Sequence, residues 1–328
     1  MLSLLPEILS STFNTMSSSP VLPTSSTRRQ FLVTSLAAAG GVLTAEAASP
    51  PGDIDAHVHV WTPDTEHYPI AKGFTKKKDM VPASFTPEQL FAYTVPNGVA
   101  RVVLIQMSFY KYDNRYMLDT MARHPGVFSG VGILDHDASD AKATLKALVK
   151  QGVRGLRLYA NKPDVEAWLS SPNMHALWTQ AADQGVAMCL LANPDSLPAI
   201  KQLAQKFPKT RVVIDHFARV GMKGPVQEAD LENLCRLAEL PQCYVKTSAF
   251  YALGAKKPPY KDLAPMIKRL HGVYGAKRLM WASDCPYQVE EGQSYQAAIE
   301  LVRKGLDFLS ADDKKWMLRG TAQKVFFS

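Results

Sequence analysis

Four side chains capable of acid–base or metal chemistry stand in short apolar runs of this sequence. Two of them, His57 and His59, lie two residues apart in Ile54–Trp61, where apolar and polar residues alternate. In a β-strand this alternation puts Asp55 and both histidines on one face and the apolar residues on the other. Two imidazoles on one face can reach the same metal ion or substrate oxygen. The structural alternative is a pair of half-buried histidines without chemistry.

The other two side chains, His216 and Asp284, end later apolar runs. Each alone has an ordinary structural explanation, since His216 could satisfy a helix end and Asp284 could cap a helix. An ionisable group left unpaired inside a core is costly, however, and four of them at matching strand ends favour one shared polar site.

Eight β-rich runs alternate with amphipathic helical patterns after residue 52. The expected strands are Ile54–Trp61, Arg101–Met107, Val127–Leu134, Val153–Tyr159, Val186–Leu191, Arg211–His216, Gln242–Thr247 and Leu279–Ser283. This alternation implies parallel strands joined by right-handed crossovers, and eight such units predict an α/β fold of the (β/α)8 TIM-barrel type. A doubly wound open sheet is the alternative. No Gly-x-Gly-x-x-Gly follows a strand, which excludes the usual dinucleotide-binding form of that sheet.

Helices are expected in nine places, the first of them opened by Thr86 as N-cap and Pro87 at the first helical position. The others are Tyr112–His124, Ser139–Lys150, Pro172–Gln184, Leu197–Phe207, Gln227–Leu240, Tyr260–Tyr274, Gln293–Leu309 and Ala311–Arg319.

Further polar residues at the strand ends predict a substrate site, because barrel enzymes bind substrate on the loops that follow the strands. These are Arg157, Tyr159, Gln106, Lys246 and Arg219. A bidentate arginine suits a carboxylate. The net charge of +7 would favour an anionic small molecule, although simple solubility explains the charge better. No basic tract interleaved with aromatic residues occurs, so a nucleic-acid partner is not expected.

Four segments, in this order, resemble the amidohydrolase superfamily, in its amidohydrolase-related branch of TIM-barrel hydrolases. They are Asp55–His59, Gly152–Arg157, Asp215-His216 and Ala282–Pro286. The similarity covers nearly all of the domain expected at 48–328 and is closest to the lactonases that act on sugar lactones and pyrone dicarboxylate. It therefore implies a hydrolase of ester bonds that opens a lactone.

The resemblance also implies roles: Asp284 as general base, with His57, His59 and His216 polarising the carbonyl. In metal-using members the strand-one histidines and the strand-eight aspartate hold the ion, helped by a strand-five histidine. Here the fifth strand has no histidine, and the fourth lacks the lysine or glutamate that bridges two metals. We therefore expect either no cofactor or one divalent metal ion, with zinc the expected element. His57, His59 and Asp284 would hold the ion, with His216 as a further ligand.

Two other functions stay open at this stage. Metal-dependent, non-oxidative decarboxylation occurs in the same branch, but it normally needs the absent strand-five histidine. A non-catalytic periplasmic binding protein is the other, and the general-base candidate Asp284 argues against it. No Gly-x-Ser-x-Gly motif supports a serine hydrolase.

Residues 1–47 have the layout of an export signal. Arg28-Arg29 is followed by a short apolar run, Leu36–Leu43, and by the small-x-small cleavage pattern Ala45–Ala47. The paired arginines resemble the twin-arginine signal, which implies the twin-arginine export machinery as a partner and a periplasmic location. The apolar run is too short for a permanent membrane anchor. Met16 is a second candidate start, since the signal would then have ordinary length.

Four cysteines occur without zinc-site spacing. Free buried thiols are expected, although Cys235 and Cys243 are close enough in sequence to form a disulfide.

Overall fold

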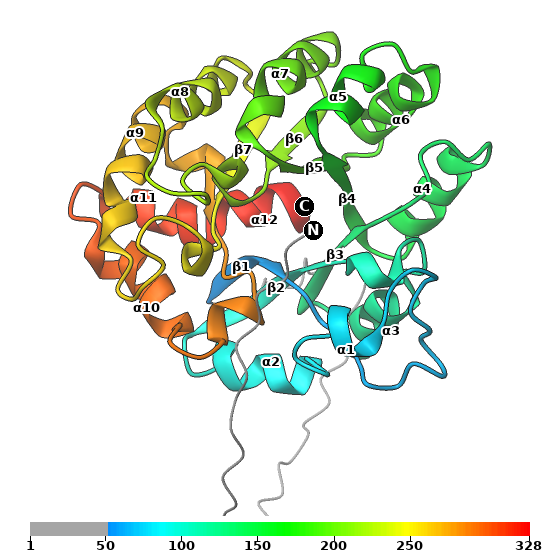
Figure 1. Ribbon diagram of the computed structural model, residues 1–328, viewed down its shortest axis with the longest axis horizontal. Coiled ribbons are helices and arrows are strands. Elements are labelled where there is room, and N and C mark those ends of the chain that lie inside the picture. Colours follow the sequence, from blue (N-terminus) through cyan, green and yellow to red (C-terminus); the bar gives the residue numbers. More distant parts are fainter. Residues whose placement is uncertain (1–51) are drawn as a thin grey trace, which may run out of the picture. The chain divides into compact units, whose positions relative to one another are not determined.

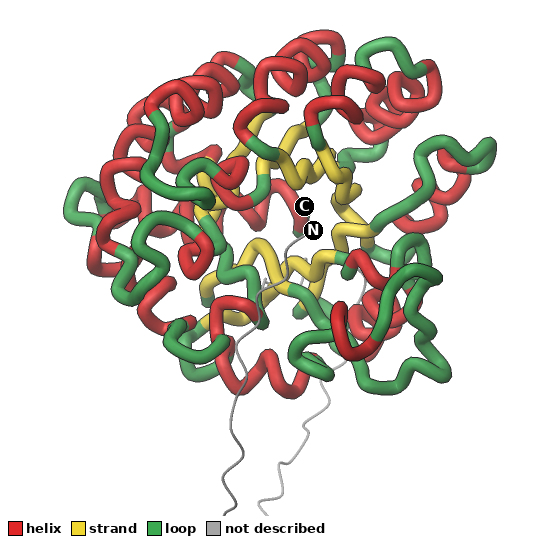
Figure 2. Tube along the Cα trace, in the orientation of Figure 1, coloured by secondary structure: helices red, strands yellow, loops and turns green. Residues whose placement is uncertain are grey.

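The computed structural model describes residues 52–328, which form a ring of eight parallel strands surrounded by helices (Figures 1 and 2). The predicted signal, residues 1–47, lies outside the described residues. The strands are β1 Asp53–Val58, β2 Val99–Ile105, β3 Phe128–Gly132, β4 Val153–Ala160, β5 Ala187–Ala192, β6 Arg211–Ile214, β7 Cys243–Thr247 and β8 Leu279–Trp281. They pair in sequence order from β1 to β8. This order confirms the TIM barrel, because a doubly wound sheet would place its first strand in the interior of the order.

Helices follow the strands, and all but α12 lie around the ring (Figure 1). They are α1 Lys76–Asp79, α2 Pro87–Thr94, α3 Arg115–Arg123, α4 Ala141–Lys150, α5 Lys162–Trp168, α6 Pro172–Asp183, α7 Leu197–Lys206, α8 Glu228–Arg236, α9 Ala264–Tyr274, α10 Tyr295–Glu300, α11 Ala311–Lys315 and α12 Thr321–Phe326. The start of α2 is as predicted, with Thr86 and Gln89 forming a capping box. The patterns did not predict α1, α5 and α12, which have four to seven residues and show too few turns for a clear period.

The two helices expected at the end of the chain are interrupted. The helix predicted at Gln293–Leu309 begins as α10 and continues as the wider turns of a π-helix over Leu301–Gly305. The next one likewise passes from α11 into a π-helix at Trp316–Gly320 before α12.

The barrel interior is a packed core rather than a pore. Inward side chains of seven strands form one apolar cluster with Ala322, Val325 and Phe326 of α12. Helix α12 also accepts hydrogen bonds from Arg101, in the first half of β2, and from Arg211, at the start of β6. It therefore closes the amino-terminal end of the barrel. Polar chemistry is thereby confined to the opposite end, where barrel active sites lie.

The barrel closes between β1 and the segment that follows β8. The amide of Asp284 donates to the carbonyl oxygen of His57 over 2.9 Å, and the amide of His59 donates to that of Cys285 over 2.9 Å. The first and last strands of the domain therefore bring a histidine and an aspartate, more than 220 residues apart, onto adjacent backbones.

Asp55 strengthens this closure, and its placement corrects one prediction. Its carboxylate accepts hydrogen bonds from the Ser283 amide at 2.9 Å and from the Tyr295 hydroxyl of α10 at 3.0 Å. The pairing of β1 with β2 shifts register between Asp55 and Val58, so strict alternation fails. Asp55 consequently faces the helical layer instead of sharing a face with the histidines.

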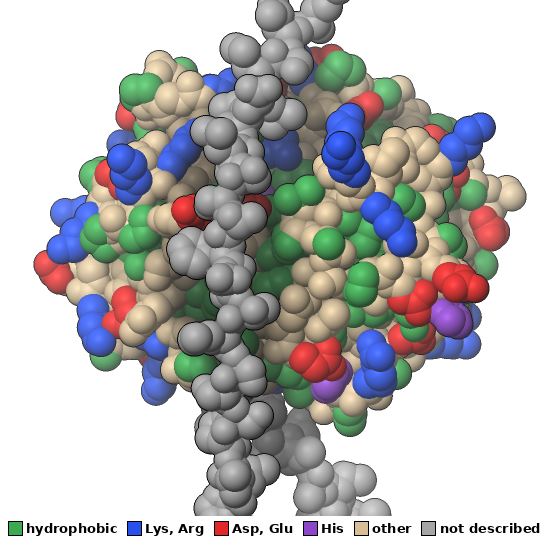
Figure 3. Space-filling model, turned by 60° about the horizontal axis from the view of Figure 1, so that its bottom comes forward, with side chains coloured by type: hydrophobic (Ala, Val, Ile, Leu, Met, Phe, Trp, Pro, Cys, Tyr) green, Lys and Arg blue, Asp and Glu red, His purple; other side chains and the backbone are tan. Residues whose placement is uncertain are grey.

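The charged surface is mixed. On the face shown in Figure 3, Lys and Arg side chains are interspersed with Asp and Glu side chains.

The four cysteines are free and buried, as predicted, so the alternative of a Cys235–Cys243 disulfide is wrong. Among residues 52–328, no helix combines the length and the apolar character needed to cross a membrane.

Candidate active site

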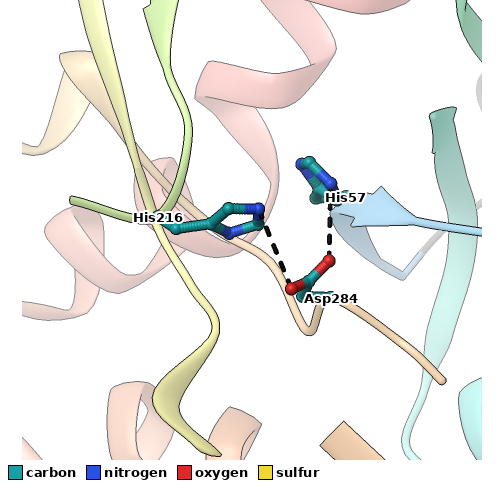
Figure 4. A group of neighbouring side chains, drawn as sticks. All are labelled: His57, His216 and Asp284. Carbon is teal, nitrogen blue, oxygen red and sulfur yellow. Dashed lines mark ion pairs between the residues drawn. The ribbon is translucent and has the colours of Figure 1, made fainter. Parts of the chain in front are cut away.

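The four residues singled out first lie together at the carboxyl end of the barrel. The carboxylate of Asp284 lies among three imidazoles, with His57 Nε2 at 3.4 Å, His59 Nε2 at 3.3 Å and His216 Nε2 at 3.8 Å. Figure 4 shows the Asp284 carboxylate between the rings of His57 and His216. All four side chains are buried. Strands β1 and β6 end at Val58 and Ile214, so His59 and His216 stand in loops rather than in strands as predicted.

Unusual backbone conformations present two of these side chains. Four consecutive residues after β6, His216 to Arg219, have φ between 51° and 59°, and Asp284 has φ of 67°. Left-handed conformations cost roughly 1–2 kcal/mol for each residue other than glycine. Such strain persists where surrounding structure enforces it, commonly at functional sites. The left-handed turn lets His216 and Arg219 line the same cavity although they are only three residues apart.

Asp284 is held as a carboxylate. Burial would raise its pKa, but the neighbouring His216, His59 and His57 bring the pKa well below its ordinary value. Tyr251 donates a hydrogen bond from its hydroxyl to Oδ2 over 2.7 Å. The other oxygen, Oδ1, is buried and has no hydrogen-bond partner within the described chain. Asp284 can therefore accept a proton from a molecule placed beside it.

The histidines differ in which nitrogen carries the proton. Burial lowers the pKa of His216. Burial and the charge of the neighbouring Lys246 lower the pKa of His57 well below its ordinary value, so both histidines are neutral near pH 7. His59 Nδ1 lies 2.9 Å from the carbonyl oxygen of Ile105, which can only accept, so Nδ1 carries a proton and Nε2 faces Asp284 Oδ1 at 3.3 Å.

His57 has the opposite arrangement. Its Nδ1 lies 3.1 Å from the ammonium nitrogen of Lys246, a group that can only donate. Nδ1 also faces Asp215 Oδ1, but at the longer distance of 3.4 Å, so the Lys246 contact favours a proton on Nε2, which lies 3.4 Å from Asp284 Oδ1 and 3.3 Å from His59 Nε2. His216 Nδ1 contacts the Ser248 hydroxyl at 2.8 Å, and because a hydroxyl can donate or accept, His216 can also present an N–H to the cavity.

Lys246 does not line the substrate cavity, which corrects its predicted role. It projects into the barrel from β7 with no exposed surface and pairs with Asp215 Oδ1 at 3.0 Å. Burial would raise the pKa of Asp215, but Lys246 and then His57 bring it well below the ordinary value. This ion pair lies directly behind His57 as seen from Asp284.

A cavity of about 310 Å³ lies in front of Asp284 and is lined in part by His59, His216, Arg157 and Arg219. Arg157 donates to the backbone oxygen of Gln106 at 3.1 Å, and Arg219 donates to the side-chain oxygen of Asn193 at 3.1 Å. Neither guanidinium has a carboxylate within 4.0 Å in residues 52–328. The cavity therefore carries two positive charges that an anionic group could neutralise.

Two other residues predicted to bind substrate lie outside this cavity. Gln106 is buried, and its side-chain amide donates to the backbone oxygen of Asp113 over 2.7 Å, so it holds the loop after β2. Tyr159 lies under the Arg157 guanidinium at 5.3 Å and lines a neighbouring cavity of about 640 Å³. The structure places Arg157 and Arg219 beside Asp284, and both of these residues were predicted.

The sequence assigned no role to four residues that contact the site, Tyr251, Ser248, Asp215 and Tyr287. Tyr251, Ser248 and Tyr287 lie in loops, where no periodic pattern indicates direction. Asp215 offered a signal, because it occupies the position next to Lys246 once β6 and β7 pair in parallel register.

A divalent metal was one expectation, and the donor types suit it. Ligand atoms of His57, His216 and Asp284 all lie within 4.8 Å of one another, and Nε2 of His59 lies 3.3 Å from both His57 Nε2 and Asp284 Oδ1, so all four predicted ligands are within reach of one point. A metal-bound histidine, however, almost always donates its other N–H to an acceptor. His57 meets the Lys246 ammonium there instead, so His57 does not fit the role of a ligand in this arrangement.

Comparisons with known proteins agree with this architecture. The family model described as Amidohydrolase matches residues 54–327. An L-fucono-1,5-lactonase from Burkholderia ambifaria is 28% identical over 236 residues, which cover 71% of this chain and 80% of the relative. The crystal structure of a putative 2-pyrone-4,6-dicarboxylic acid hydrolase from Pseudomonas putida has a TM-score of 0.69 at 27% identity, covering 85% of this chain and 98% of the other. A zinc-bound amidohydrolase from Burkholderia multivorans shares the fold, with a TM-score of 0.70 at 20% identity over 84% of this chain and 99% of the other.

Proposed function

Since this chain belongs to the amidohydrolase family, we propose that it hydrolyses a lactone that carries a negatively charged group. The observation that carries the proposal is the Asp284 carboxylate, surrounded by histidines and facing a cavity with two unpaired arginines. The two relatives compared above have names that denote lactone hydrolysis, which supports the reaction class.

The proposed reaction begins when Asp284 takes a proton from a water molecule that attacks the ring carbonyl. The carbonyl oxygen becomes an oxyanion and receives a hydrogen bond from the Nε2–H of His57, with His216 as a second donor. The ring C–O bond then breaks, and the proton on Asp284 passes to the leaving oxygen. One water is consumed and one hydroxy acid is formed.

Arg157 and Arg219 are proposed to bind the anionic group of the substrate. Both lie on the cavity wall, and desolvation with the charge of Arg157 lowers the pKa of Arg219 from its ordinary value. An anion between them would relieve this repulsion through charge-assisted hydrogen bonds. Charge complementarity thus favours carboxylated lactones over neutral sugar lactones.

Zinc was the expected metal, and the zinc-bound amidohydrolase from Burkholderia multivorans has the same fold. The reaction proposed here uses no metal, because His57 and His216 supply the hydrogen bonds to the oxyanion. The decarboxylase alternative is weaker, since β5 has no histidine to complete its expected ligand set.

The experiment for this proposal is a lactone panel assayed by acid release, with protein treated with a chelator and checked for residual metal. Neutral aldonolactones and carboxylated lactones of similar ring size form matched pairs. We expect turnover of the carboxylated member in metal-free protein and a higher kcat/KM than for its neutral partner. Absence of turnover over the whole panel, with and without added zinc, would contradict the proposal and support a binding protein.

We also propose that residues 1–47 direct export of the folded protein to the periplasm through the twin-arginine machinery. The support is the Arg28-Arg29 pair and the short apolar run that follows it. In a bacterial host, Arg28→Lys with Arg29→Lys should keep the protein in the cytoplasmic fraction. Equal periplasmic yield of this variant and the unaltered protein would refute twin-arginine export.

A further inference from the structure

A buried lysine stands where the outer partner of a metal-binding histidine would stand. Lys246 Nζ lies 3.1 Å from His57 Nδ1 and 3.0 Å from Asp215 Oδ1, and all three side chains have no exposed surface. The ring of Phe326 lies 5.4 Å from the ammonium on the side of α12. Lys246 is therefore enclosed by an anion, an imidazole and an aromatic ring, and it cannot turn to solvent.

This enclosure determines the hydrogen bonding of His57. Nδ1 of His57 lies closer to the Lys246 ammonium, at 3.1 Å, than to Asp215 Oδ1, at 3.4 Å. Because an ammonium group only donates, the closer contact makes Nδ1 an acceptor and places the ring proton on Nε2. A metal ligand needs the reverse, a lone pair on Nε2 and an N–H on Nδ1 that meets an acceptor. The structure supplies such an acceptor in Asp215, whose Oδ1 lies 3.4 Å from Nδ1, but the ammonium of Lys246 lies closer to that oxygen, at 3.0 Å.

We propose that Lys246 is a positioning residue that keeps His57 a hydrogen-bond donor and thereby keeps divalent metal out of this site. The ammonium acts in two ways. It fixes the tautomer of His57, and its charge repels a second cation in a buried region where salt screens little. Lys246 thus provides a fixed positive charge behind His57, and the oxyanion donor needs no metal to support it.

The same geometry predicts how the site could be converted. With a neutral residue at position 246, Asp215 is free to accept the Nδ1–H of His57. The lone pair of Nε2 would then face Asp284, and the donor atoms of His57, His216 and Asp284 already lie within 4.8 Å of one another. This arrangement is the carboxylate–histidine pair typical of zinc sites.

The first measurement uses the unaltered protein. Nitrogen-15 NMR of labelled histidines, with His57→Gln for assignment, should show His57 as the Nε2–H tautomer. Calorimetric titration with zinc chloride should show no stoichiometric binding that shifts the His57 signals. A Nδ1–H tautomer, or one zinc bound per chain with the His57 signals shifted, would overturn the inference.

The second measurement compares Lys246→Met with Lys268→Met, a matched change at a surface lysine. Lys246→Met should bind zinc about 10–100-fold more tightly than the unaltered protein, the usual effect of an outer-shell partner, and His57 should change tautomer. Lys268→Met should behave as the unaltered protein does. Equal zinc affinity in Lys246→Met and Lys268→Met would refute the inference.

Lys246→Met leaves Asp215 buried without its partner and could fail to fold. The double variant Lys246→Met with Asp215→Asn removes both charges and still offers an oxygen to Nδ1, so it should show the same gain in zinc affinity. The inference concerns the metal affinity of the site in the proposed lactonase, and it rests on the proposed function only in taking this site to be catalytic. Zinc affinity and tautomer are measured without substrate, so a failed lactone panel and a failed metal experiment give separate results.

Discussion

The hydroxyl group of Tyr251 lies 2.7 Å from Oδ2 of Asp284 and donates a hydrogen bond to it. The contact joins the loop after β7 to the loop after β8, and it leaves Oδ1 as the carboxylate oxygen without a hydrogen-bond partner in residues 52–328. One oxygen of the proposed base is thus held by Tyr251, and the other lies between Nε2 of His57 at 3.4 Å and Nε2 of His59 at 3.3 Å.

Tyr251→Phe removes a donor that stabilises the charged carboxylate, so the pKa of Asp284 should rise. Asp284 starts well below the ordinary value, and the acid limb of the pH–kcat/KM profile should therefore move to higher pH. The measurement is this profile on a carboxylated lactone. Tyr68→Phe, which deletes a surface Tyr–Asp hydrogen bond of similar length, is the control. Identical acid limbs in both variants would show that Tyr251 does not tune the base.

Arg157→Gln tests the binding of the anionic group. A hydrogen bond to a charged group contributes about 1.5–3 kcal/mol, so kcat/KM for a carboxylated lactone should fall about 10–100-fold, mainly through KM. The neutral partner lactone should be affected little. Arg154→Gln, on the same strand but bonded to backbone oxygens of Val149 and Val153, should leave both substrates unchanged. An equal loss for charged and neutral lactones would argue against a role in charge recognition.

Asp55 predicts a pH dependence of stability. Burial raises its pKa to about 6, above the ordinary 3.8, although hydrogen bonds from Ser283, His57 and Tyr295 partly offset this. The folded protein therefore holds this proton more tightly than the unfolded chain does. The resulting stabilisation is full below pH 4 and is lost as pH rises through 6, an effect of about 3 kcal/mol.

The measurement is urea unfolding of the unaltered protein and of Asp55→Asn between pH 4 and pH 7. Because asparagine does not titrate, the stability of the variant relative to the unaltered protein should grow by about 3 kcal/mol over this range. A difference that stays constant with pH would mean that Asp55 does not titrate there.

Much of the fold could be predicted from the sequence, because burial imposes a period on the chain. Parallel strands buried on both faces give apolar runs such as Val186–Leu191, and helices such as Pro172–Asp183 begin with capping residues. Strand ends were less certain. Stopping β1 at Val58 depends on a register shift against β2, which arises from tertiary pairing and not from the local pattern.

The centre of the site was also predictable, since a closed barrel brings its first and last strands together and so places His57 beside Asp284. The surrounding contacts were not. Arg219 reaches the cavity only through a left-handed turn, and Tyr251 follows Ala249, which also has positive φ. The pairing of Lys246 with Asp215 requires the β6–β7 register, so the sequence alone assigned Lys246 to the substrate instead of to His57.

The proton-accepting role of Asp284 is the central claim, and Asp284→Asn tests it most directly because the side chain keeps its shape and loses its basicity. Both proteins are freed of metal, shown to have the same circular dichroism spectrum, and assayed at pH 7 on the best carboxylated lactone. General-base catalysis contributes roughly 10²–10⁴-fold, so kcat of Asp284→Asn should fall by about that factor. If the kcat of Asp284→Asn stays within about twofold of the kcat of the unaltered protein, the result contradicts the claim.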